Sequence, residues 1–95
     1  MKLEWSVAAL ADLDRFAEFL HDRHPDMAAR IASEILERAG IIAEHPQLGR
    51  PIAGRDDYRE LVLRVLNAAY VFRYAHDGKR VVMLRVFHSR EQRDL

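Results

Sequence analysis

The sequence predicts an α+β domain in which a helical hairpin packs on one face of a mainly antiparallel sheet. Two patterns along the 95 residues indicate this fold. Between residues 7 and 45, apolar side chains recur every three or four positions, which is the period of an amphipathic helix. From Tyr58 onward the period is two, and β-branched and aromatic residues become frequent, as in strands. The expected order of elements is β-α-α-β-β-β, one layer of helices against one sheet.

Two helices are expected in the first half of the chain. Ser6 is suited to cap the first helix, and Pro25 ends it because the residue before a proline is pushed out of the helical region. Asp12 and Asp14 are expected on the solvent side of this helix. The first apolar stripe consists of Val7, Leu10, Leu13, Phe16, Ala17 and Leu20, and the second of Met27, Ile31, Ile35, Ala39 and Ile42.

Four strands are expected, beginning with a short one at residues 2–5. Residues 47–57 contain two Gly and one Pro and are predicted to form a loop. Three strands then follow at residues 59–65, 69–75 and 80–87. Asp77-Gly78 is a strong signal for a type I′ turn, because both residues accept a positive φ. Short connections of this kind predict an antiparallel meander.

Composition places the chain in one broad class. Its length suits a single domain over residues 1–95. There is no cysteine, so disulfides and thiolate zinc sites are excluded. No apolar run approaches the ~18 residues of a membrane span, and the N-terminus lacks a signal-peptide pattern. We therefore expect a cytoplasmic protein without membrane contact.

Motifs for metal, cofactor or nucleophilic chemistry are missing from the sequence. His21 and His24 have the spacing of two metal ligands at a helix end, but no third ligand accompanies them. No phosphate-binding Gly-rich loop, nucleophile elbow or metalloprotease motif occurs. We expect neither a metal site nor a cofactor.

Charge is divided between the two halves of the chain. Residues 1–50 have a net charge of −3 and residues 51–95 a net charge of +3. Almost all basic residues are Arg, which favours planar contacts with carboxylates and phosphates. The C-terminal half is therefore expected to meet an acidic partner, either protein or nucleic acid.

Strand alternation predicts a second apolar face on the sheet. In the last strand, Val82, Leu84 and Val86 are expected on one face. Two helices cover only one face of a sheet, so the other face should need a partner. The alternative is that residues 47–57 cover it. The face expected to be uncovered carries Val81, Met83, Arg85 and Phe87.

A basic set on the sheet and tail is the strongest candidate for chemistry. It includes Arg59, Arg73, His88 and Arg90. Arg59 and Arg73 lie on neighbouring predicted strands and could approach each other. A His beside arginines can act as general acid or base while the arginines stabilise a pentavalent phosphate. The alternative is an edge histidine with arginines that pair with nearby carboxylates.

Several segments in a fixed order carry a resemblance to a known family. They are Trp5 with Ala8, Ala11 and Asp12-Leu13; His45-Pro46-Gln47-Leu48-Gly49-Arg50; Tyr58-Arg59-Glu60-Leu61; Tyr70-Val71-Phe72-Arg73-Tyr74; and Val82 through Arg90. Over nearly its whole length the chain resembles the RelE/ParE superfamily, toxins of type II toxin–antitoxin systems.

The resemblance implies one of two activities. RelE-like members are ribosome-dependent mRNA endoribonucleases, and here Arg59, Arg73 and His88 would be the catalytic residues. ParE-like members inhibit DNA gyrase without a known catalytic residue. In the family an Arg often follows the position matched by Tyr70, whereas this chain has Val71 there. The sheet also has almost no Lys, and no Tyr follows Phe87. These departures favour a ParE-like gyrase inhibitor with Arg59, Arg73, His88 and Arg90 as target-binding candidates. A third possibility is a member that retains only antitoxin binding.

The same resemblance implies a cognate ParD-like antitoxin in a hetero-oligomer. Family antitoxins dimerise to bind operator DNA and wrap the toxin with a C-terminal segment that is often helical and acidic. The toxin would thus reach operator DNA only through its antitoxin. Such a segment is expected to cover Val81, Met83 and Phe87, with acids meeting Arg73 and Arg85.

Overall fold

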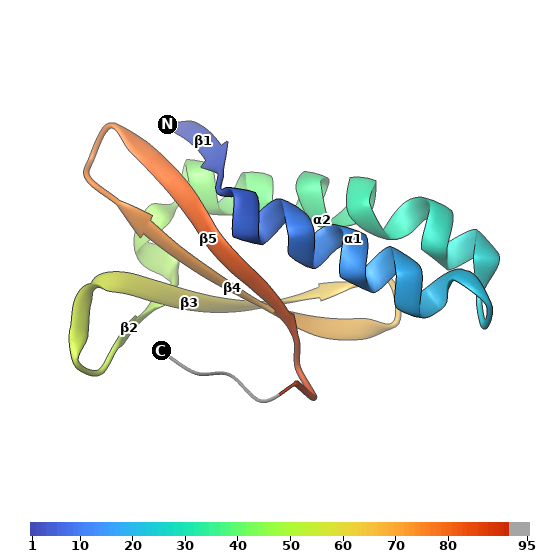
Figure 1. The fold of residues 1–95 in the computed structure, drawn as a ribbon. Helices are drawn as coiled ribbons and strands as arrows, with labels where there is room; N and C mark the ends of the chain where they lie inside the picture. Colours follow the sequence, from blue (N-terminus) through green and yellow to red (C-terminus); the bar gives the residue numbers. More distant parts are fainter. Residues whose placement is uncertain (92–95) are drawn as a thin grey trace.

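The computed structural model of the chain describes residues 1–91. The chain folds into one sheet and one helical hairpin (Figure 1). In chain order the elements are β1 (Lys2–Trp5), α1 (Val7–His21), α2 (Pro25–Glu44), a 3₁₀ turn (Pro46–Leu48), β2 (Arg50–Ile52), β3 (Arg55–Val65), β4 (Ala68–His76) and β5 (Arg80–His88).

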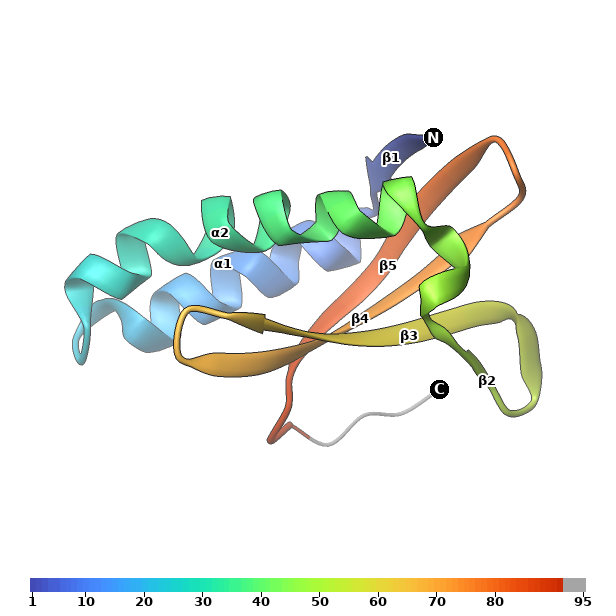
Figure 2. The same ribbon diagram turned by 180° about the vertical axis from the view of Figure 1, so that it is seen from behind.

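The sheet has the order β1-β5-β4-β3-β2. Only β1 runs parallel to its neighbour, β5, and the other pairs are antiparallel. Both helices lie on the same face of the sheet, as the two ribbon views show (Figures 1 and 2). The predicted α+β class and the predicted order of helices and long strands are confirmed. We call the face away from the helices the open face.

Strand β2 was not predicted. Its three residues pair with β3 at the sheet edge, and Pro51 lies at their centre. So short a segment shows no alternation, and a proline is tolerated in it because edge strands leave one side unpaired. Residues 50–52 thus extend the sheet at its edge, which corrects the prediction of a continuous loop over residues 47–57.

Local signals at the helix ends explain where the helices begin. The hydroxyl of Ser6 accepts a hydrogen bond from the amide of Ala9 at 3.0 Å and caps α1. Pro25 occupies the first position of α2, where its fixed φ suits a helix and its missing N–H costs nothing. Asp26 follows in the first turn and interacts favourably with the helix dipole. Neither helix combines the length and apolar character needed to span a bilayer.

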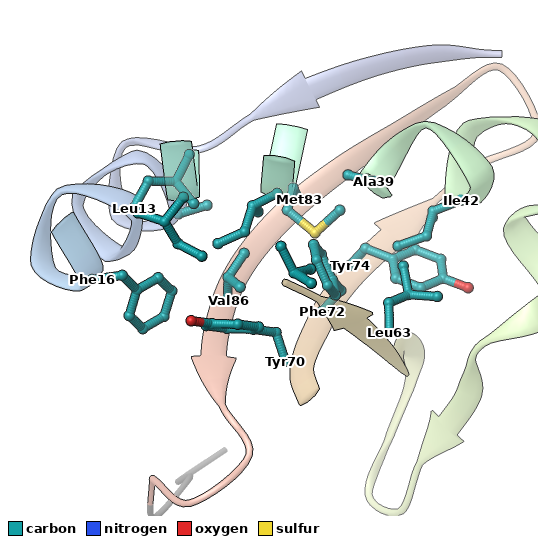
Figure 3. Packing of buried hydrophobic residues seen from close by; sticks show 14 of the residues in the cluster. Leu13, Phe16, Ala39, Ile42, Leu63, Tyr70, Phe72, Tyr74, Met83 and Val86 are labelled. Carbon is teal, nitrogen blue, oxygen red and sulfur yellow. The ribbon is translucent and has the colours of Figure 1, made fainter. Parts of the chain in front are cut away.

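The core fills the space between the hairpin and the sheet (Figure 3). Phe72, Tyr74 and Met83 from the central strands are fully buried there. The helices contribute Ala9, Leu13, Phe16, Ile31, Ile35, Ala39 and Ile42. The two predicted apolar stripes supply all of these helical residues except Ala9, whereas Val7 and Leu10 point to solvent. The helix period therefore predicted the buried face of the helices correctly, except at the start of α1.

A bulge in β5 changes which of its residues face the helices. Arg73 pairs with Arg85 and Tyr74 pairs with Met83, so Leu84 has no partner on β4. The extra residue shifts the alternation by one position. As a result Val81, Met83 and Val86 all lie in the core. The expectation that Val81 and Met83 lie on the uncovered face, opposite Val86, is wrong.

The β4–β5 turn differs in backbone conformation from a simple type I′ hairpin. At the β4–β5 turn only Gly78 has a positive φ, of 89°, so the expectation of positive φ at both Asp77 and Gly78 is wrong. The Asp77 carboxylate instead accepts hydrogen bonds from the amides of Lys79 and Arg80, which hold its pKa below the ordinary value.

Candidate functional site

Two rows of side chains cross the open face of the sheet. The first row is apolar and follows the register Val62–Val71–Phe87 across β3, β4 and β5. The second is charged and follows Glu60–Arg73–Arg85. We call these six residues the open-face cluster. An apolar row beside a charged row suits an amphipathic partner segment.

Phe87 links the two rows. The guanidinium groups of Arg73 and Arg85 lie 5.1 and 4.9 Å from the centre of its ring, within cation–π range. Arg73 is only 6% exposed, and its Nε donates to Glu60 at 2.9 Å. Val62 is 59% exposed and gives this face its accessible apolar surface. Arg85 and Phe87 thus lie on the predicted face, but Phe87 is only 5% exposed, so the expectation that it is uncovered is wrong. Val81 and Met83 lie on the other face, in the core.

Asp12 connects helix α1 to β5. Its carboxylate accepts hydrogen bonds from Arg85 Nε at 2.8 Å, from Arg15 at 2.9 Å and from the backbone amide of Val86 at 2.8 Å. It is 2% exposed, so the prediction that Asp12 is a solvated residue is wrong. The available signal was its position three residues after the buried Ala9, on the same helical face.

Arg59 holds the segment between α2 and β2 in place. Its guanidinium donates to the carbonyls of Gly49 at 2.7 Å and Gln47 at 3.4 Å. The Tyr74 hydroxyl donates to the Pro46 carbonyl and accepts from the Gly49 amide at 2.8 Å. A Cβ on Gly49 would lie 2.5 Å from that hydroxyl oxygen, so only glycine fits here. The two hydrogen bonds from the Arg59 guanidinium to backbone carbonyls give Arg59 a structural role.

His88 lies at the opposite end of the sheet. Its ring packs edge-on against Tyr70, with centroids 5.3 Å apart. Its Nδ1 accepts from the Arg90 amide at 3.1 Å, and its own amide donates to Glu91 Oε1 at 2.7 Å. Arg90 itself is exposed. Burial, and then the Glu91 charge, raises the pKa of the Tyr70 hydroxyl, so this phenol stays neutral near pH 7.

The structure does not bring Arg59, Arg73 and His88 together. Arg59 pairs with Tyr74 and therefore points to the face opposite Arg73. His88 pairs with Tyr70, three positions from Arg73 along β4 and also on the other face. A general acid or base acts only within hydrogen-bond reach of the reacting atoms. These three side chains are thus not arranged around one phosphate, and the expected approach of Arg59 to Arg73 is wrong.

Carboxylates and imidazoles do not form a metal centre in the described part of the chain. Among residues 1–91 no group of three or more His, Asp or Glu is placed to hold an ion.

Comparisons with known proteins show to which family the chain belongs. The family model described as "ParE toxin of type II toxin-antitoxin system, parDE" matches residues 3–93. A putative toxin, Y4kP, of Sinorhizobium fredii is 34% identical over 92 residues, which cover 96% of this chain and 91% of that protein. Toxin RelE1 of Caulobacter vibrioides is 33% identical over 88 residues, with 93% and 92% coverage.

A solved structure shows the same fold. A chain of the "Chromosomal ParDE TA system from P. aeruginosa" matches with a TM-score of 0.74 and 23% identity, covering 93% of this chain and 95% of that one. The similarity spans both helices and the sheet rather than an isolated motif.

Proposed function

Because this chain belongs to the ParE toxin family of type II toxin–antitoxin systems, we propose that it arrests growth by binding DNA gyrase. The observation that carries the proposal is the separation of Arg59, Arg73 and His88. An RNA-cutting site needs a proton-transfer group and cations around one phosphate. A toxin without that arrangement acts by binding, and gyrase is the target that the ParE-like resemblance implies.

Two assays distinguish gyrase inhibition from RNA cleavage. The purified toxin is added to a supercoiling reaction with DNA gyrase, and the toxin is induced in cells whose mRNA is mapped for cuts. We expect inhibition of supercoiling and an early DNA damage response. Ribosome-dependent cuts that precede any effect on DNA would instead support the endoribonuclease alternative.

His88 provides a residue-level test of the same proposal. Replacing His88 with Ala is expected to lower toxicity less than about tenfold, because losing a general acid or base costs ~10²–10⁴ in rate. Toxicity is measured as the inducer level that halves growth, at equal amounts of folded protein. A collapse of toxicity with intact folding would contradict the binding mechanism.

The antitoxin is proposed to cover the open-face cluster. Val62 offers exposed apolar surface beside Arg73 and Arg85, which suits a segment that carries apolar and acidic residues. In this arrangement the antitoxin supplies any contact with operator DNA. Val81 and Met83 face the helices in the core, so they have no part in the proposed contact.

Substituting Val62 tests this placement. Val62→Gln is expected to weaken antitoxin binding by about tenfold, since a side chain buried in an interface core is worth ~1–2 kcal/mol. The affinity is measured by titrating the purified antitoxin. Leu48→Gln, at a residue that is similarly exposed but off this face, is the control and should leave the affinity unchanged.

A further inference from the structure

The outer side of the helical hairpin carries exposed apolar side chains. Val7, Leu10 and Leu36 are 85%, 46% and 42% exposed. In both ribbon views no other described element covers the side of α1 and α2 that faces away from the sheet (Figures 1 and 2). Large apolar side chains gathered on one surface of a small domain mark an interaction site.

Two of these side chains continue the helix faces that line a groove between the two helices, since Leu10 lies seven positions before Ala17 and Leu36 seven positions after Ala29. Near the hairpin turn the groove opens into a cavity of about 500 Å³ lined by Ala17, Glu18, His21, Pro25, Ala28 and Ala29. Because Ala17, Ala28 and Ala29 line the same cavity, residue 17 lies level with residues 28 and 29 along the hairpin. Counting back along the antiparallel helices places Leu10 opposite Leu36. The small side chains keep the groove shallow, so that a partner helix can pack between the two ridges.

The exposed surface of the two helices is acidic, and one of its carboxylates, Glu18, lines this groove. Asp14, Glu18, Glu37 and Glu44 lie on the exposed side of the two helices, and none of them forms an ion pair among residues 1–91. We call these four residues with Val7, Leu10 and Leu36 the hairpin groove. Residues 7–44 contain eight acidic and four basic side chains.

All four arginines of the hairpin are engaged away from the groove. Arg15 binds Asp12 and Glu91, and Arg30 binds Glu34. Arg23 stacks on the Phe19 ring, and Arg38 donates to the Arg64 carbonyl at 3.1 Å. The carboxylates of the hairpin groove therefore keep their negative potential, which attracts a partner of opposite charge.

We infer that the hairpin groove docks a basic amphipathic helix of the protein that the toxin inhibits. The inference rests on the proposed function, in which that protein is DNA gyrase. An amphipathic helix presents apolar anchors to a groove and charged residues to its rim, so Lys and Arg would meet these carboxylates. An acidic antitoxin segment would be repelled here. Target and antitoxin thus bind different surfaces.

Charge reversal in the groove tests the inference. The double variant Asp14→Lys with Glu37→Lys is expected to lower gyrase affinity at least tenfold and to remove growth arrest, while antitoxin affinity stays within about twofold, because like charges across an interface oppose association. Leu36→Gln should weaken gyrase binding in the same way. Binding is measured with purified gyrase holoenzyme and with purified antitoxin, and thermal unfolding verifies that each variant is folded.

Matched controls change the same chemistry elsewhere. Asp56→Lys alters the charge of an exposed carboxylate on β3, and Leu48→Gln removes exposed apolar surface from the 3₁₀ turn. Both should retain gyrase affinity and growth arrest. A groove variant that loses antitoxin affinity overturns the inference, because the occupant is then the antitoxin. A folded groove variant that retains full gyrase affinity overturns it as well.

Failure of the proposed function gives a different result. If the wild-type toxin arrests growth without binding gyrase, the gyrase proposal fails, and growth arrest alone tests the groove. Loss of growth arrest in the folded double variant then supports docking of another target in the hairpin groove. Retained growth arrest overturns the groove as a docking site. A wild-type toxin that neither binds gyrase nor arrests growth overturns both.

Discussion

Replacing Asp12 with Ala is expected to lower the free energy of unfolding by about 3 kcal/mol. The carboxylate is 2% exposed and accepts hydrogen bonds from Arg85, Arg15 and the Val86 amide. Removing it leaves the Val86 amide, which is buried, without an acceptor. The two arginines are about 40% exposed and regain water, which keeps the loss below that of a fully buried pair. Chemical denaturation measures the change.

Asp14 provides the control, two residues along the same helix. It is exposed and forms no ion pair among residues 1–91. Asp14→Ala should change stability by no more than about 0.5 kcal/mol, as surface substitutions do. Equal losses for the two variants would contradict the role of Asp12 as the link between α1 and β5.

Replacing Met83 with Asp is expected to remove a large part of the free energy of unfolding. Met83 is 0% exposed and lies between the central strands and the helices (Figure 3). A carboxylate there has no partner and costs about 4 kcal/mol or more. Total stability of a small domain is only ~5–15 kcal/mol. Circular dichroism and the unfolding transition measure the outcome.

Val62→Asp is the corresponding change on the open face. Val62 is 59% exposed, so its carboxylate would remain in water and the fold should persist. A well-folded Met83→Asp variant with weak antitoxin binding would mean that residue 83 lies on the partner surface after all. Unfolding of Val62→Asp with a stable Met83→Asp variant would reverse the assignment of the two sheet faces.

The fold was largely predictable because its long elements follow regular periods. Helices of 15 and 20 residues show several turns of a 3.6-residue stripe, and the proline at residue 25 marks the break between them. The three long strands alternate clearly enough to be found. Strand β2 was missed because three residues around Pro51 carry no period. A sequence period predicts a helix or strand only where that element is long enough for the period to repeat.

The candidate site was less predictable because it depends on pairing between distant strands. Counting every second residue through β5 placed Met83 on the open face, since nothing in the sequence announces the bulge at Leu84. Arg59 and Arg73 are fourteen positions apart, and only the strand register reveals that they point to opposite faces. Asp12 has the sequence context of a solvated helix residue, and only the folded structure shows that Arg85 lies beside it.

The pairing of the first strand with the last one affects when the toxin can fold. Strand β1 lies parallel to β5, the Ser6 amide donates to the Met83 carbonyl, and Asp12 holds the Val86 amide. These contacts join residues more than seventy positions apart, and contacts of such long range form late and slowly. During synthesis the N-terminal helices must wait until β5, the last described strand, has left the ribosome. The packed domain therefore forms only after β5 has been made.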